Sequence, residues 1–129
     1  MPRQHIQKPT EAELEILTIL WQRETATVRE VHEIINERRP TAYTTVLKTL
    51  QIMTEKSLVE RETEQKAHIY RAKIEQAATE RNFAEDLLNR VFGGSAAQLV
   101  MRVLETKPAS DKELAQIRQM LDEAEGREK

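Results

Sequence analysis

Cysteine is absent from this chain of 129 residues, which rules out disulfide bonds, thiolate metal sites and cysteine nucleophiles. Aromatic residues make up only 4%, and the chain holds three glycines and four prolines. So few turn formers and aromatic residues favour long helices and predict a mainly α-helical protein. At this length we expect one domain or two small subdomains.

Long hydrophobic runs are missing as well. No apolar segment approaches the length needed to span a bilayer, and residues 1–20 lack the continuous apolar region of a signal peptide. We therefore expect a cytoplasmic protein with no membrane insertion.

A strong charge of either sign is also lacking, since the formal net charge is −2. Its distribution is uneven, because residues 1–73 carry 12 Lys and Arg against 11 Asp and Glu, whereas residues 74–129 carry 8 against 11. From Arg38 to Thr54 there are three basic residues and no acid. A local basic surface of this kind can bind phosphate while the acidic remainder keeps the protein in solution.

The patterns of common catalytic sites are absent too. The three histidines, His5, His32 and His68, are scattered. The segment from His32 begins like a zinc-protease helix but has Asn36 where the second histidine is needed. No glycine-rich phosphate loop or nucleophile elbow occurs. We expect neither an enzyme nor a cofactor or metal site.

Capping boxes, in which Ser or Thr is followed three residues later by Glu or Gln, begin at Thr10, Thr27, Ser95 and Ser110. The first two open helices with apolar residues at helical spacing. These residues are Leu14, Leu17, Leu20 and Trp21 in the first helix, and Val28, Val31, Ile34 and Ile35 in the second. Between the helices, Thr25-Ala26 is an edge strand or a turn. Arg38-Arg39-Pro40 ends the second helix, because the residue before a proline avoids helical angles.

A third helix follows, which Thr41 is placed to cap. On a helical wheel Val46, Leu50 and Met53 define its buried side, with Tyr43 and Leu47 beside them. The opposite side carries polar residues, one lysine and one isoleucine: Thr41, Thr44, Thr45, Lys48, Gln51 and Ile52.

Two runs rich in β-forming residues come next, Leu58–Thr63 and Ala67–Ala72, separated by Glu64-Gln65-Lys66. The pattern predicts a β-hairpin. Three helices followed by a hairpin give the element order of a winged helix-turn-helix. We therefore predict a winged-helix domain over residues 1–73, in a mainly α fold with a small β-hairpin.

Residues 74–129 have a purely helical pattern. A long helix reaches about Phe92 and stops at Gly93-Gly94, and two more helices begin at Ser95 and Ser110. Three amphipathic helices of this length are marginal as an independent core, so we predict a dimerisation region that pairs with a second copy. The alternative is that these helices pack back on the winged-helix domain. The predicted dimer contacts are Leu87, Leu88, Val91, Leu99, Val100, Val103, Leu104, Leu114, Ile117 and Leu121.

The exposed side of the third helix suits double-stranded DNA. Thr44, Thr45 and Lys48 lie near its N-terminal end, the part of a recognition helix that meets the bases, and their side chains match base edges. Tyr43 is predicted to lie along the DNA backbone, with its hydroxyl on a phosphate. We interpret the hairpin that follows the helix as basic. The remaining predicted DNA contacts are Lys8, Arg38, Arg39, Thr41, Lys66, His68 and Arg71. The alternative is that the threonines are ordinary caps and the basic residues are solvated surface charges.

Five motifs occur in order along the chain. They are Glu11–Leu17 with Trp21, Ala42–Val46, Ala67–Arg71, Phe92–Ser95 with Leu99-Val100, and Glu113-Leu114 with Leu121–Glu123. Together they resemble the penicillinase-repressor family (BlaI/MecI/CopY type), over about residues 8–125.

The resemblance implies a homodimeric winged-helix repressor on a palindromic operator, with Thr44, Thr45 and Lys48 contacting bases. In relatives tied to the β-lactam response, a membrane-linked metalloprotease cuts an Asn-Phe bond in the short helix after the Gly-Gly break. The matching positions here are Arg102 and Val103. The copper-responsive branch uses a cysteine cluster, which this chain lacks. Two further departures are Ser57, where relatives usually have Gly, and Ile52, where a basic residue is common.

We therefore expect a dimeric repressor that is relieved by proteolysis of its dimerisation region. Two alternatives stay open. One is a repressor switched by a small molecule bound between the two halves, and the other is a winged-helix adaptor that binds proteins instead of DNA.

Overall fold

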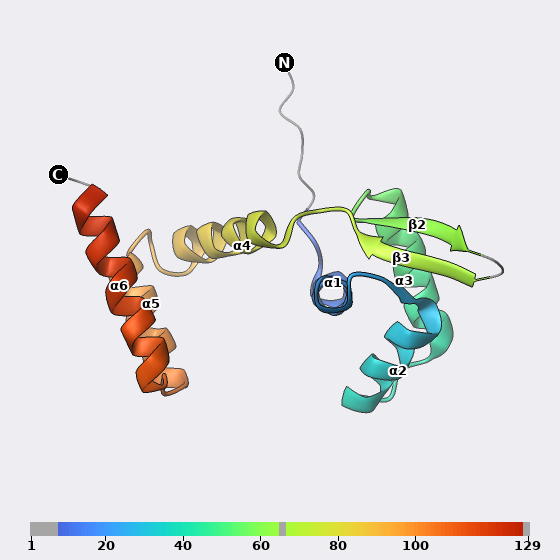
Figure 1. Cartoon of the computed structure of the whole chain (residues 1–129), viewed down its shortest axis with the longest axis horizontal. Helices are drawn as coiled ribbons and strands as arrows, with labels where there is room; N and C mark the ends of the chain where they lie inside the picture. Colours follow the sequence, from blue (N-terminus) through green and yellow to red (C-terminus); the bar gives the residue numbers. More distant parts are fainter. Residues whose placement is uncertain (1–7, 65–66, 128–129) are drawn as a thin grey trace, which may run out of the picture. The chain divides into compact units, whose positions relative to one another are not determined.

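The protein is described here by a computed structural model, which covers residues 8–64 and 67–127. The chain divides into two compact units, residues up to 84 and residues from 85 on. Figure 1 shows the elements in chain order: α1 (Glu11–Arg23), β1 (Ala26–Thr27), α2 (Val28–Arg38), α3 (Tyr43–Glu55), β2 (Val59–Glu64), β3 (Ala67–Ala72), α4 (Gln76–Arg90), α5 (Ala96–Thr106) and α6 (Asp111–Arg127). This order confirms a winged helix followed by three helices.

The first two helices begin at the predicted capping boxes. In α1 the Thr10 amide donates to Glu13 Oε1 at 2.9 Å, and the Glu13 amide donates to Thr10 Oγ1 at 3.2 Å. In α2 the same exchange joins Thr27 and Glu30 at 2.8 and 3.1 Å. Each box satisfies two amides at the helix start, which explains why the sequence pattern located these ends so well.

The third helix begins differently from the prediction. Its N-cap is Ala42, which offers no side-chain hydrogen bond, so the prediction that Thr41 caps α3 is wrong. The Thr41 hydroxyl instead donates to the carbonyl of Arg39 at 2.9 Å. The hydroxyl is thereby used inside the turn between α2 and α3. The end of α2 at Arg38, just before Pro40, is as predicted.

The sheet has three antiparallel strands in the order β1-β3-β2. Tyr70 in β3 lies opposite Ala26 of β1 on one side and Arg61 of β2 on the other. The predicted hairpin is confirmed, although β2 begins at Val59, one residue later than predicted. The short segment before α2 is an edge strand, shifted by one residue to Ala26–Thr27.

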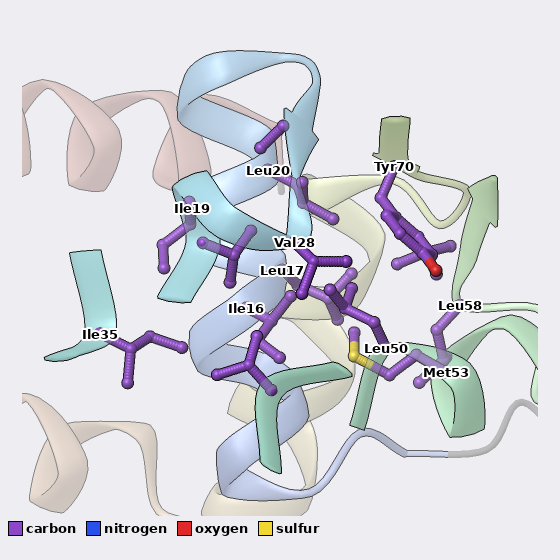
Figure 2. Close-up of a cluster of buried hydrophobic side chains, with 14 residues drawn as sticks. Ile16, Leu17, Ile19, Leu20, Val28, Ile35, Leu50, Met53, Leu58 and Tyr70 are labelled. Atoms are coloured by element: carbon purple, nitrogen blue, oxygen red, sulfur yellow. The ribbon is translucent and has the colours of Figure 1, made fainter. Parts of the chain in front are cut away.

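The hydrophobic core lies in the first unit, between α1, α2, α3 and the sheet. Figure 2 shows Leu17, Leu50 and Tyr70 converging from α1, α3 and β3. The predicted buried side of α3, Val46, Leu50 and Met53, is confirmed. In α1 the deepest residues include Ile16 and Ile19, whereas Leu14 and Trp21 of the predicted stripe are only partly buried. The helix buries residues beyond one stripe because it packs against both β3 and α3.

One carboxylate is buried beside this core. The Glu13 residue is only 3% exposed, and its Oε2 accepts a hydrogen bond from Lys56 Nζ at 2.8 Å. Burial by itself raises the pKa of Glu13, but the hydrogen bonds from Lys56 and Thr10 outweigh it and lower the pKa below its ordinary value. The start of α1 is therefore joined by an ion pair to the end of α3.

The second unit consists of helices with little buried surface. Gly93 and Gly94 have φ angles of 56° and 85°, and the Gly94 amide donates to the carbonyl of Leu88, which ends α4 as the sequence predicts. Ser95 Oγ and Ser110 Oγ accept amide hydrogen bonds at the starts of α5 and α6. None of the residues of α5 is buried. Across the described residues, every helix is too short or too polar to span a bilayer.

Candidate nucleic-acid interface

The outer face of α3 is the centre of the candidate interface. Thr44, Thr45, Lys48 and Gln51 are all exposed, on the side of the helix opposite its three core residues. Lys48 takes part in no ion pair within the described residues. Its ammonium group therefore remains available to an acceptor outside the chain.

Two large side chains frame this face along the helix. Tyr43, the first residue of α3, is 45% exposed, and Ile52 in the third turn is 37% exposed. The face thus presents hydroxyl and methyl groups, one cation and one apolar side chain. These groups match the donor, acceptor and methyl pattern of base edges in a major groove.

The turn that leads into α3 is held by side chains of α2. His32 Nε2 lies 2.7 Å from the carbonyl oxygen of Thr41, and because a carbonyl only accepts, His32 is the donor. The Thr41 amide donates to Asn36 Oδ1 at 2.9 Å. The His32 ring also meets the Tyr43 ring edge-on, with centroids 5.7 Å apart and an angle of 76° between the planes. Thr41 is partly buried by these contacts.

The arginines at the end of α2 are shared with a carboxylate from α1. Arg39 reaches Glu15 with both terminal nitrogens, at 2.6 and 3.1 Å, and Arg38 joins the same carboxylate at 3.2 Å. The hydrogen bond from Arg39 is the main reason that the pKa of Glu15 lies below its ordinary value. The cluster keeps one net positive charge instead of two.

The hairpin differs in charge from the sequence interpretation. Between Val59 and Ala72 there are three acidic and three basic residues, so the interpretation of the hairpin as basic is wrong. Arg71 forms an ion pair with Glu62 at 2.9 Å, and His68 Nδ1 lies 3.1 Å from Thr63 Oγ1. Lys66 lies outside the described residues. Two of the predicted contacts are therefore engaged across the hairpin.

Lys8 lies apart from these groups. Its Nζ is 4.7 Å from the centre of the Phe83 ring in α4, a cation–π distance. The structure thus brings together the predicted residues of α3 and the α2–α3 turn, while Lys8 is placed beside α4.

The predicted dimer contacts in the second unit are largely exposed. Val91 is 65% exposed and Val103 54%, and the exposed large hydrophobics from residue 85 on are Leu87, Val91, Val100, Met101, Val103, Leu104, Met120 and Leu121. Leu88, Leu99, Leu114 and Ile117 are partly buried. The prediction omitted Met101 and Met120. Arg102, at the predicted cleavage position, is exposed and paired with Glu105 at 2.9 Å on the polar side of α5.

Three residues that shape the interface were missed from the sequence: Glu15, His32 and Asn36. In the sequence, His32 and Asn36 stand out only as parts of an incomplete metalloprotease motif. Their role depends on how the chain turns at Pro40, and no local pattern signals that geometry.

The family model for the penicillinase repressor matches residues 9–123. The chain belongs to the penicillinase repressor family. This confirms the resemblance inferred from the five motifs, all of which lie within the matched residues. The family's members named below are repressors and transcriptional regulators, a class without enzymatic activity.

Curated relatives match this family member over different lengths. The penicillinase repressor of Bacillus licheniformis is 23% identical over 120 residues, covering 93% of this chain and 94% of the relative. The methicillin resistance regulatory protein MecI of Mammaliicoccus sciuri is 22% identical over 111 residues, covering 86% and 90%. The transcriptional regulator BlaI of Mycobacterium tuberculosis is 45% identical over a shorter stretch of 56 residues, 43% of this chain and 41% of the relative.

Solved structures support the fold. The DNA-binding domain of the repressor BlaI superposes with a TM-score of 0.51 at 19% identity, covering 58% of this chain and 92% of that domain. The oxidised form of MarR from E. coli superposes with a TM-score of 0.52 at 15% identity, covering 89% of this chain and 74% of MarR. At these identities the likeness establishes the winged-helix fold alone.

Proposed function

We propose that this protein is a dimeric winged-helix transcriptional repressor that binds a palindromic DNA operator. The observation that carries the proposal is the exposed face of α3, which presents the side chains of Thr44, Thr45 and Lys48 to solvent. These residues follow a turn that is hydrogen-bonded to α2. Membership of the penicillinase repressor family supports the same function.

Within this proposal the residues divide into two roles. Thr44, Thr45 and Lys48 contact base edges and supply sequence discrimination. The residues assigned to the DNA backbone are Thr41, Tyr43, Arg38, Arg39, Lys66, His68 and Arg71. Because Arg38 and Arg39 share the carboxylate of Glu15, they contribute less positive charge to phosphate binding than two free arginines would.

We assign dimerisation to residues 74–129 and DNA binding to residues 1–73. The exposed apolar side chains of α4 and α5 support this, because monomers rarely leave so many large hydrophobics in water. The first turns of α4 belong to the first compact unit, which extends to residue 84. Trp21 Nε1 donates to the carbonyl of Ile74, just before α4, at 3.1 Å, and Thr79 in α4 is buried.

Relief of repression is assigned to cleavage of α5 between Arg102 and Val103, by a membrane-linked metalloprotease as partner. Both side chains are exposed, and Val103 lies on the apolar side of α5. A cut at this bond would divide the helix that carries the predicted dimer contacts. Operator affinity would fall with the dimer, because two linked DNA-binding units bind far more tightly than one.

A repressor switched by a small molecule is the second candidate. An open surface hollow of about 370 Å³ lies in the first unit, lined by Leu20, Trp21, Glu24, Thr25, Arg71 and Ala72. A ligand there would touch Trp21, whose Nε1 donates to the carbonyl of Ile74 just before α4. Incubation with the cognate membrane protease and mapping of fragments by mass separates the two switches, because the ligand-switched repressor stays intact throughout.

Salt dependence tests the proposed function against the adaptor alternative. The full chain should bind a selected DNA duplex with an affinity that falls steeply as salt rises, because phosphate contacts release counterions. An affinity for protein partners with no measurable DNA binding at low salt would instead support the adaptor.

A further inference from the structure

The start of α3 depends on contacts from α2. Helices α1, α2 and α5 begin at Thr or Ser residues whose side chains accept amide hydrogen bonds, whereas Ala42 gives α3 none. Both backbone polar groups of the preceding residue, Thr41, are bound by α2 side chains instead: the amide by Asn36 and the carbonyl by His32. The chain is thus tied to α2 at Thr41, two residues before α3 begins.

His32 makes the second of these contacts in a constrained way. Its Nε2 must donate to the Thr41 carbonyl at 2.7 Å, and this fixes the rotation of the imidazole ring. The fixed ring then meets the Tyr43 ring edge-on. Tyr43 is 45% exposed, so the His32 ring packs against a side chain that otherwise faces solvent.

We propose that His32 is a positioning residue for DNA recognition, which holds the Thr41 carbonyl by a hydrogen bond so that the first turn of α3 meets base edges in register. The inference rests on the proposed function. Tight recognition needs side chains held near their productive geometry by supporting hydrogen bonds. Displacement of this turn would cost the base contacts of Thr44 and Thr45, which form only on the correct sequence, and would spare general phosphate attraction.

The test compares two replacements of His32, each of which keeps one property of the histidine side chain and removes the other. His32→Gln keeps a side-chain N–H donor to the Thr41 carbonyl, whereas His32→Phe keeps the ring and loses the donor. Glu33→Gln, at the next and exposed position of α2, is the matched control. The full chain first selects a duplex from a random library, and each variant is then titrated with the selected and a scrambled duplex, after its thermal midpoint confirms folding.

We expect His32→Phe to bind the selected duplex about five- to tenfold more weakly, the scale of one lost hydrogen bond, with affinity for the scrambled duplex within about twofold of wild type. His32→Gln and Glu33→Gln should stay within about twofold on both. Equal losses on both duplexes, an unaffected His32→Phe, or equal losses for Phe and Gln would each overturn the proposal.

Asn36→Ala gives a second measurement if His32→Phe does not fold. Asn36 is exposed, so its removal leaves the Thr41 amide accessible to water and should preserve the fold. The same selective loss on the selected duplex is expected, and its absence would contradict the positioning role of these contacts. If the wild-type chain selects no sequence from the library, the proposed function itself is overturned. This result is obtained before any variant is compared, so it is distinguishable from failure of the positioning role.

Discussion

Lys48 and Arg39 are both exposed cations near α3, yet their surroundings predict different roles. Lys48 has no ion-pair partner among the described residues, whereas Arg39 is bound by Glu15 through two nitrogens. We expect Lys48→Ala to relax discrimination at one base step, costing about 1–3 kcal/mol on the selected duplex. Arg39→Ala should weaken binding to all sequences alike. Titrations with selected and scrambled duplexes measure both, and the same pattern of losses for the two variants would contradict the assignment.

Ser57 has a left-handed backbone, with φ of 65°, at the turn between α3 and β2. Among the amino acids, glycine adopts such an angle most readily. Ser57→Gly should raise the free energy of unfolding by about 0.5–1 kcal/mol, because glycine adopts positive φ without a side-chain clash. Chemical denaturation measures the change. Ser57→Ala is the control and should give no gain; a gain of the same size in both variants would show that backbone strain is not the cause.

Lys56 should stabilise the fold through buried Glu13, and the effect should depend on pH. Lys56→Met is expected to lower the free energy of unfolding by about 1–2 kcal/mol near pH 7, since it leaves a buried carboxylate without its cation. The pKa of Glu13 is lowered in the folded state, so the stabilisation is present above the ordinary carboxyl pKa, about 4.3, and is lost as pH falls through the lowered pKa. The deficit of Lys56→Met should therefore shrink in acid.

Denaturation curves of Lys56→Met and wild type between about pH 3 and pH 7 test this window. Lys73→Met, at an exposed position, is the control for loss of a lysine. A deficit that stays constant with pH would mean that Glu13 does not carry the effect.

Residue-level predictions succeeded where the signal was local in sequence. The caps at Thr10 and Thr27 were predictable because a capping box needs only residues three apart. The predicted cap at Thr41 was wrong because α3 begins one residue later than a Thr41 cap requires, and the hydroxyl donates to the carbonyl of Arg39 in the turn instead. The partner of Arg39 could not be predicted, since Glu15 is 24 residues away in the chain.

At the scale of elements, periodicity located the helices and the hairpin, and their ends fell within a few residues of the structure. Elements of this kind follow from hydrophobic spacing and caps, which a sequence displays directly. Two features depend on packing between distant segments: the position of β1 beside β3, and the inclusion of the first turns of α4 in the first unit. These features were left open or missed for that reason.

The apolar side of α5 gives a prediction for the element as a whole. Val103→Asp places a charge on that side, and burying an unpaired carboxylate in a dimer costs at least about 2 kcal/mol. We expect sedimentation to shift toward monomer at micromolar concentration and affinity for the selected duplex to fall. Gln98→Asp, on the polar side of the same helix, should leave the dimer unchanged. Equal sedimentation of Val103→Asp and wild type would contradict the assigned interface.

At the scale of the whole molecule, the proposed function depends on a contrast between two parts of the chain. The winged-helix unit has a hydrophobic core, whereas the helices that follow it expose apolar side chains to water. The first unit contains its own hydrophobic core, with Leu17, Leu50 and Tyr70 buried in it. The second lacks such a core, which is the physical reason to expect a second copy. Pairing raises operator affinity through effective concentration and also makes the complex sensitive to any cut that separates the pair.

Selection of duplexes from a random DNA library by the full wild-type chain, followed by sequencing of the bound pool, tests this claim most directly. A two-fold dimer of winged-helix units predicts enrichment of an inverted repeat whose half-sites keep a constant spacing, because each α3 reads one half. Enrichment of a single unrepeated motif, or of no motif, would contradict it.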